Sequence, residues 1–171
     1  MPAKTTKPAA KPERTPSAAA TQKQVDAFAA KYLPGIARQF KAANATMRKR
    51  LPGAYAMAYD NWNGLVIGYS PTPRPSDALF SILAQPDHIT LCFLQGVHLV
   101  DPKKLLRGAG NQVRSVRLVD GLSLETPAVK ALMAQALEAD ENARMLDPAN
   151  VAPKDKLVVR SVSAKQRPRR P

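Results

Sequence analysis

Residues 56–119 constrain the fold most, because short segments of alternating character are separated there by residues typical of turns. Asn63-Gly64 predicts a hairpin between the first two segments, since both residues tolerate positive φ. Within residues 88–94, the odd-numbered positions are apolar, which predicts that they face the core. His88, Thr90 and Cys92 then face a more polar side or a cleft. Strands are predicted over residues 55–59, 65–69, 78–84, 88–94 and 113–119.

Helical patterns flank these strands. Thr21 and Gln24 have capping-box spacing, which predicts a helix that begins at Thr21. A second helix is predicted from residue 36 to about residue 50, and Thr126-Pro127 favours the start of a third. The element order predicts an α+β fold: an antiparallel sheet of about five strands with two N-terminal helices and one C-terminal helix.

The net charge of +13 is concentrated outside this region. Residues 1–21 hold four Lys or Arg against one acid, and residues 148–171 hold seven against one. Residues 22–147 hold fifteen against eleven. We therefore expect a folded domain over residues 22–147. It is flanked by a disordered basic Lys/Ala/Pro tail, residues 1–21, and by a basic, disordered C-terminal tail, residues 148–171.

Length and cysteine usage suggest the class of protein. A chain of 171 residues suits one domain with tails. Its single cysteine, Cys92, cannot form an internal disulfide. The sequence has no apolar run long enough to span a membrane and no secretory signal pattern. These features predict a soluble, cytoplasmic protein without a membrane partner.

Several segments together resemble the YdhG-like domain of unknown function. The resemblance covers roughly residues 22–140 and leaves out both tails. It implies helices packed on one face of an antiparallel sheet, in agreement with the strand and helix patterns. The segments that carry it are YDNWNGL (59–65), SDALFSI (76–82), FLQG (93–96), DPKKLLRGAGNQVR (101–114) and TPAVKAL (126–132).

The same family is distantly frataxin-like, and some members are described as iron chaperones. Iron sites of that kind use a ridge of carboxylates, because hard cations favour oxygen ligands. The first predicted helix has Asp26 as its one acid, and the second has none. Iron chaperone activity is therefore the third and most distant hypothesis.

The thiol and the two imidazoles do not form a catalytic pattern. His88 and Cys92 share a strand face but lie about 13 Å apart along it, too far for a nucleophile and its base. Neither they nor His98 show the paired spacing of metal ligands. We expect a structural or surface role for each of the three. The sequence thus predicts no catalytic residue, no metal site, no cofactor and no enzymatic activity.

Two segments are candidates for ligand binding. Residues 60–63 place Asp60, Asn61 and Asn63 as polar contacts at the mouth of a pocket, with Trp62 as its apolar wall; the alternative is an ordinary turn. Gly108-Ala109-Gly110 precedes a strand, not a helix, so a turn is favoured over a phosphate loop. Nearby basic side chains could hold an anion. They are Lys103, Lys104, Arg107 and Arg114.

These patterns lead to two functional hypotheses. The preferred one is a non-enzymatic module that binds a small ligand or a protein partner. The alternative is a protein that binds nucleic acid non-specifically through its tails. The sequence leaves the ligand's identity and the oligomeric state open. The tail residues assigned to phosphate contacts are Lys4, Lys7, Lys11, Lys165, Arg167, Arg169 and Arg170.

Overall fold

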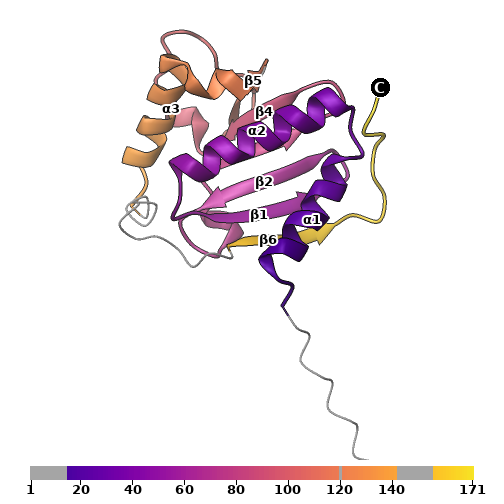
Figure 1. Cartoon of the computed structure of the whole chain (residues 1–171). Helices are drawn as coiled ribbons and strands as arrows, with labels where there is room; N and C mark the ends of the chain where they lie inside the picture. Colours follow the sequence, from indigo (N-terminus) through magenta and orange to yellow (C-terminus); the bar gives the residue numbers. More distant parts are fainter. Residues whose placement is uncertain (1–14, 120, 142–155) are drawn as a thin grey trace, which may run out of the picture.

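A computed structural model describes residues 15–119, 121–141 and 156–171 (Figure 1). Three helices, six strands and three short 3-10 turns follow one another in this part of the chain. In order they are α1 (Ala18–Ala29), α2 (Pro34–Arg50), β1 (Tyr55–Asp60), β2 (Leu65–Ser70), η1 (Pro75–Asp77), β3 (Phe80–Ala84), β4 (Ile89–Phe93), η2 (Gly96–His98), β5 (Arg114–Leu118), η3 (Gly121–Glu125), α3 (Pro127–Glu138) and β6 (Leu157–Val162).

The sheet has the order β5-β4-β3-β2-β1-β6. Strands β1 to β5 form the expected antiparallel meander. The prediction of a five-stranded antiparallel sheet is nevertheless wrong, because β6 adds a sixth strand parallel to β1. It comes from a segment predicted to be disordered. The reason is local: Leu157, Val158 and Val159 are strand-favouring residues in an otherwise basic, proline-containing segment.

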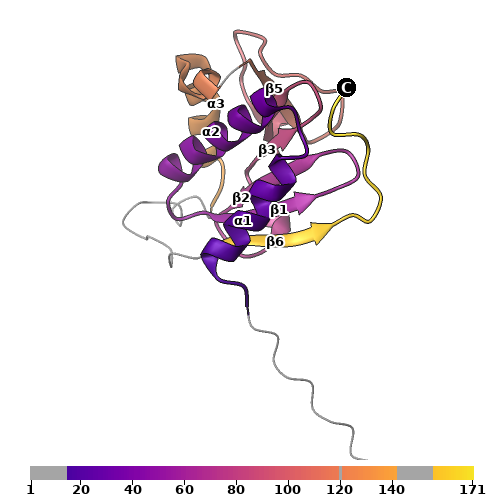
Figure 2. The same ribbon diagram turned by 45° about the vertical axis from the view of Figure 1, so that its right-hand side comes forward.

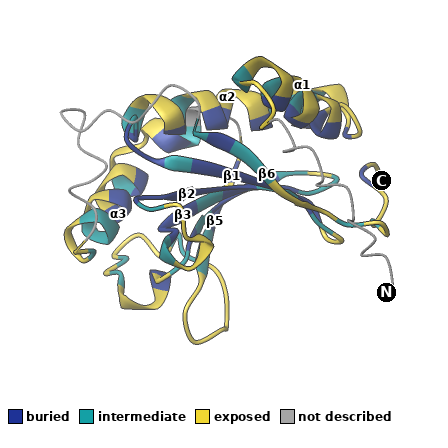
Figure 3. Cartoon of the chain, turned by 90° about the horizontal axis from the view of Figure 1, so that it is seen from below, coloured by how far each residue is buried: buried dark blue, intermediate teal, exposed yellow. Residues whose placement is uncertain are grey.

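Helices α1 and α2 cover one face of the sheet (Figure 3). Each of these helices has an apolar stripe toward the sheet, since Val25 and Phe28 of α1 and Phe40 and Met47 of α2 are buried in the core. The α+β class is confirmed. Helix α3 contributes Met133 to the same core. None of the helices that the structure describes combines the length and apolar character needed to cross a bilayer.

Strand β4 confirms the predicted alternation. Ile89, Leu91 and Phe93 are buried in the core beneath the helices. Cys92 instead faces the other side of the sheet, where it lines an apolar cleft of about 360 Å³ with Met57, among other residues. Of the three residues predicted to share this side of β4, Cys92 lines the cleft, whereas His88 lies beside Asp87 and Arg117.

Helix α1 begins earlier than its capping-box spacing predicts. Ser17 is the N-cap, and its hydroxyl accepts a hydrogen bond from the Ala20 amide. Thr21 lies within the helix and is buried. Alanines 18–20 explain the difference, because alanine is the strongest helix former and extends the helix toward the N-terminus.

The β1–β2 hairpin is present, but positive φ is not its cause. Among the described residues, the positive φ angles belong to Lys104 and Gly108, not to Asn63 or Gly64. Glycine is required at position 64 because the backbone there lies very close to the backbone of β3. A Cβ atom there would lie 2.4 Å from the carbonyl oxygen of Ala84.

Residues 163–171 run past the β1–β2 turn toward the end of α1 (Figure 2). The Ser163 amide donates to the Asp60 carbonyl, and the Arg167 amide donates to the Trp62 carbonyl. The expectation of a disordered tail is therefore wrong for residues 156–171. The composition of this segment does not reveal that it is ordered, because its hydrogen-bond partners lie about a hundred residues away in the sequence. Gln166 and Asp60, for example, are 106 residues apart.

Candidate functional site

The two groups of predicted ligand-site residues lie at opposite ends of the sheet. Residues 60–63 form the β1–β2 turn, whereas Arg114 begins β5. The register across the sheet aligns Leu65 with Leu118, at the far end of β5 from Arg114. The structure therefore does not bring the turn together with Lys104, Arg107 and Arg114 into one site.

Asp60 is fully buried and paired with cations, so it is not a contact at a pocket mouth. Lys31 Nζ lies 2.6 Å from Oδ2, and Arg169 Nη2 lies 3.0 Å from Oδ1. Burial alone would raise the pKa of Asp60. Hydrogen bonds from Lys31, Gln166 and Arg169, together with the Lys31 charge, outweigh burial and lower that pKa. The carboxylate therefore remains ionised in the interior.

The other turn residues contact the C-terminal segment or solvent. The Trp62 side chain is half exposed, and its contribution is its carbonyl, which accepts from Arg169 Nη1 at 3.2 Å. The Asn61 side chain accepts from the Ser161 hydroxyl. Asn63 is exposed. The turn thus contacts β6 and the segment that follows it.

The loop before β5 is a turn, as its glycines predict. Gly108 has a φ of 126°, and the backbones of Arg107 and Ser115 exchange two hydrogen bonds. Arg114 Nη1 donates to the carbonyls of Gly110 and Val113, which closes the loop. Lys104 and Arg107 are exposed.

The residues assigned to phosphate contacts have different surroundings. Arg169 is 6% exposed and bound to Asp60, so it cannot serve as a free phosphate ligand. Arg170 donates to the carbonyls of Lys31 and Ala30 at the end of α1. Lys165 and Arg167 are exposed. Lys4, Lys7 and Lys11 lie outside the described residues.

A cleft of about 340 Å³ lies between α1, α2 and the sheet. This volume is within the range of small-molecule sites. Its walls and floor are largely apolar, and five polar side chains of the helices lie around them. The apolar lining includes Val25, Ala29, Phe40, Ile67 and Leu157, and the polar side chains of the helices are Gln22, Asp26, Lys41, Asn44 and Arg48.

A buried polar pair lies in this cleft. The Tyr69 hydroxyl donates to Asn44 Oδ1 at 2.5 Å, and Asn44 Nδ2 donates to the Phe40 carbonyl at 2.7 Å. Burial raises the pKa of the Tyr69 phenol, and the charge of Arg48 opposes that rise. Tyr69 is therefore a neutral group at physiological pH, within electrostatic reach of the Arg48 guanidinium.

Two weak polar bridges connect α1 and α2 beside the cleft. Arg48 Nη1 donates to Gln22 Oε1 at 3.2 Å, and Lys41 Nζ lies 3.4 Å from Asp26 Oδ1. Exposed pairs of this kind contribute about 1 kcal/mol or less. Among the described residues, no acidic side chain pairs with Arg48. Its guanidinium is therefore available to an anionic group on a ligand.

The thiol and imidazoles remain separate. Burial raises the pKa of the Cys92 thiol, with a hydrogen bond from Ser81 opposing, so the reactive thiolate is disfavoured. His88 Nδ1 pairs with Asp87 at 2.7 Å, and His98 is exposed. Within the described ranges, no three or more His, Cys, Asp or Glu side chains are grouped so as to hold a metal ion.

Sequence reasoning missed the α1–α2 cleft entirely. One signal was present: Asn44 follows Phe40 by four residues, so a polar side chain lies on the apolar stripe of α2. A buried amide needs hydrogen-bond partners, and Tyr69 supplies one from the sheet. Arg48, one turn further along α2, then lies on the same side of the helix.

Comparison with known proteins does not identify the chain. No protein-family model, curated protein or solved structure matches it. The resemblance to YdhG-like domains therefore stays a prediction.

Proposed function

We propose that the protein is a non-enzymatic binding module whose ligand is a small, mostly apolar molecule with one anionic group. The α1–α2 cleft carries this proposal. It combines an apolar interior, the buried Tyr69–Asn44 pair and the guanidinium of Arg48, in a volume suited to such a ligand. We also propose a cytoplasmic location, where the lone Cys92 stays reduced.

The chemistry of the lining supports this ligand class. The tail of the ligand would cover the small part of Phe40, Ile67 and Leu157 that the cleft leaves exposed, a gain of about 25 cal/mol per Å² of apolar surface. Its anionic group would replace Gln22 as the partner of Arg48. A charge-assisted hydrogen bond is roughly twice as strong as the neutral one it replaces. A carboxylate on a short alkyl chain meets both requirements.

A binding role is favoured over catalysis by the state of the candidate nucleophiles. Cys92 has a raised pKa and lies on the opposite face of the sheet from the cleft. The Tyr69 phenol also has a raised pKa, so it is a hydrogen-bonding group and not a base. The cleft thus offers groups that hold a ligand, and its carboxylate, Asp26, is paired with Lys41.

Calorimetric titration with octanoate tests the proposal. Octylammonium has the same chain with the opposite charge, so it serves as the control ligand. We expect octanoate to bind and octylammonium to bind at least about tenfold more weakly, because Arg48 attracts the first and repels the second.

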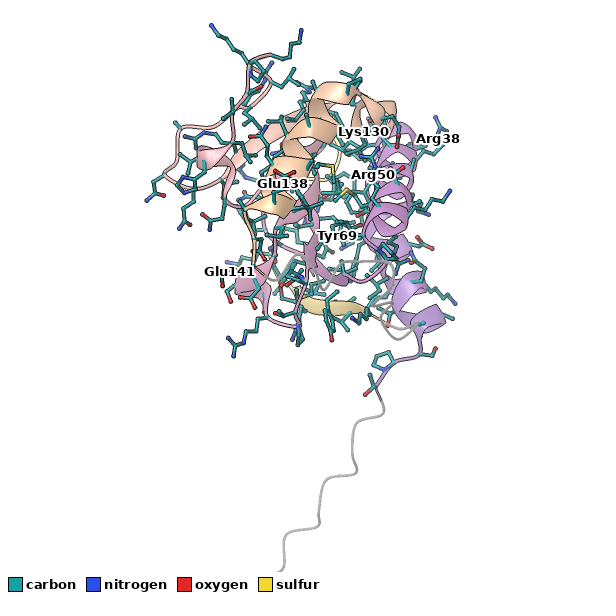
Figure 4. The ribbon with its side chains drawn as sticks, turned by 90° about the vertical axis from the view of Figure 1, so that its left-hand side faces the viewer. Arg38, Arg50, Tyr69, Lys130, Glu138 and Glu141 are labelled. Carbon is teal, nitrogen blue, oxygen red and sulfur yellow. The ribbon has the colours of Figure 1, made fainter. Side chains whose placement is uncertain are left out.

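Two matched pairs of variants locate the site. Ala45→Trp fills the cleft from an exposed position that lines it, whereas Ala42→Trp adds the same side chain at an exposed position outside it. Arg48→Met removes the proposed anion contact. Arg38→Met removes an equal charge from α2, on the outer side that points away from Tyr69 (Figure 4).

We expect Ala45→Trp to abolish octanoate binding and Arg48→Met to weaken it about tenfold, while both control variants bind as the wild type does. Equal binding of octanoate and octylammonium would contradict the anionic ligand class. Binding that survives Ala45→Trp would contradict the cleft as the site.

A further inference from the structure

Arg169 occupies a polar recess that matches a guanidinium group. Its Nη2 donates to Asp60 Oδ1 and to the Asn61 carbonyl, and its Nη1 donates to the Trp62 carbonyl. The guanidinium carbon also lies 5.7 Å from the centre of the Tyr32 ring, in cation–π range. A carboxylate, two carbonyls and an aromatic ring thus surround one planar cation.

The recess is built by rigid parts of the fold. Tyr32 donates to the Ala84 carbonyl and accepts from the Leu65 amide, which fixes its ring between two strands. Asp60 is held from the other side by Lys31. Tyr32 and Asp60 therefore each have contacts that do not involve Arg169.

The contacts select the planar fork of a guanidinium over an ammonium. Two different nitrogens of Arg169 reach three acceptors, an arrangement that the single nitrogen of lysine cannot reproduce. The Nε of Arg169 is buried and makes no hydrogen bond within the described part of the chain. The recess therefore recognises the two terminal nitrogens of the guanidinium and not its Nε.

The segment that supplies Arg169 is attached almost entirely by polar contacts. Within residues 163–171, Arg169 is the single buried residue. The remaining contacts are hydrogen bonds that Ser163, Gln166, Arg167 and Arg170 donate to backbone carbonyls, and one that Gln166 Oε1 accepts from Lys31 Nζ. A segment with one buried anchor and little apolar packing opens at a low free-energy cost.

We propose that this recess, defined by Tyr32, Asp60 and the carbonyls of Asn61 and Trp62, is a guanidinium-binding site. The chain's own Arg169 fills it in this structure, and the guanidino group of a second molecule binds there when Arg169 is absent. The site is separate from the α1–α2 cleft and does not depend on the function proposed for that cleft.

Chemical rescue of the full-length Arg169→Ala variant tests this proposal. N-acetyl-argininamide is the bare guanidino probe, and a peptide with the sequence of residues 163–171 is the second arm. Binding is followed by the thermal unfolding midpoint and by the fluorescence of Trp62, the single tryptophan of the chain. Butylammonium is the control cation, because it carries the same charge without the fork.

Arg167→Ala is the matched control protein, since Arg167 is exposed and lies two residues from Arg169. We expect Arg169→Ala to unfold at a lower temperature than Arg167→Ala. N-acetyl-argininamide should restore the midpoint of Arg169→Ala, at a concentration about tenfold below any effect of butylammonium. It should leave the midpoints of the wild type and of Arg167→Ala unchanged.

The two arms distinguish the sources of the guanidino group. The peptide also offers the contacts of Gln166, Arg167 and Arg170, so tighter binding by the peptide identifies an arginine-bearing polypeptide as the ligand. Equal binding by both probes identifies a small guanidino compound. Either result supports the site.

Three outcomes would overturn the proposal. One is a folded Arg169→Ala protein whose midpoint and Trp62 emission do not respond to either probe. Another is an equal response to butylammonium, which would indicate a general ionic effect. If Arg169→Ala is unfolded without ligand, the probes must restore its circular dichroism spectrum, and failure to do so is the third.

Discussion

Gly64 and Gly35 show how differently two glycines can be constrained. A Cβ atom at position 64 would lie 2.4 Å from the Ala84 carbonyl oxygen and 2.7 Å from Leu83 Cδ1. A Cβ atom at position 35, in the first turn of α2, would meet nothing within 4 Å. The backbone of Gly64 therefore fixes how closely the hairpin approaches β3, whereas Gly35 is not sterically restricted.

These surroundings predict stability changes of opposite sign. Gly64→Ala should destabilise the fold by about 1–3 kcal/mol, because the carbonyl it meets is backbone and cannot move aside cheaply. Gly35→Ala should stabilise it by about 0.5 kcal/mol, since alanine loses less backbone entropy in a helix. Urea denaturation of both variants measures the difference. A Gly64→Ala protein as stable as the wild type would show that the close approach is not required.

Single residues also show where sequence reasoning stops. The burial of Ile89, Leu91 and Phe93 follows from their alternation, which is a local property. The pairing of Asp60 with Lys31 and Arg169 is not local, since the partners lie 29 and 109 residues away. In the sequence, Asp60 therefore resembles an ordinary turn residue, because its cationic partners come close to it only in the folded chain.

At the level of elements, the best-predicted parts are those with a strong internal period. Helix α2 and strands β1 to β5 lie within a few residues of their predicted positions, because burial on one face imposes a period that the sequence displays. Strand β6 lacks that signal. Its burial decreases along the strand, from Leu157 to the exposed Val162, and its context is basic.

Strand β6 should exchange its amide hydrogens before the central strands of the sheet. It pairs with β1 alone, whereas β2 and β3 have a partner on each side. Local opening is easiest at an edge with few buried apolar contacts. Hydrogen exchange followed by mass spectrometry should show β6 exchanging at least about tenfold faster than β2. Equal protection would mean that β6 opens only when the whole domain unfolds.

At the level of the whole molecule, Asp60 connects parts that are distant in sequence. Lys31 follows α1, Asp60 ends β1, and Arg169 lies beyond β6. Removal of the charge in Asp60→Asn leaves Arg169 buried without its counterion. We expect a loss of about 3 kcal/mol at neutral pH, the lower end for a broken buried pair, because Lys31 is partly exposed.

The same carboxylate predicts a pH dependence. The folded-state pKa of Asp60 is lowered, so its stabilisation is fully present above the unfolded-state value of about 3.9 and is lost as pH falls through the folded-state pKa. The free energy of unfolding of the wild type should approach that of Asp60→Asn below about pH 4. Urea denaturation at pH 7, 5, 4 and 3 measures the gap. A difference in unfolding free energy between the two proteins that does not change with pH would contradict the lowered pKa of Asp60.

The hypothesis of nucleic-acid binding through the tails also concerns the whole molecule, because it depends on how many cations remain available to phosphates. Arg169 and Arg170 are engaged by the folded domain, so fewer cations are available to phosphates than the composition indicates. Gel-shift titration with duplex DNA should therefore show weak retardation that disappears as salt rises, with log K falling by about 0.9 per phosphate contact. Arg167→Ala should weaken it more than Arg169→Ala. Retardation that is insensitive to salt would contradict an electrostatic mode.

The parallel pairing of β6 with β1 also has a consequence during synthesis. The ribosome makes β1 roughly a hundred residues before β6, an interval on the order of 5–20 s at ordinary elongation rates. Throughout that interval the nascent chain carries Asp60 without Arg169 and presents the free edge of β1 to its surroundings. A chaperone that shields the edge of β1 would therefore act on this protein before β6 emerges, because β6 covers that edge afterwards.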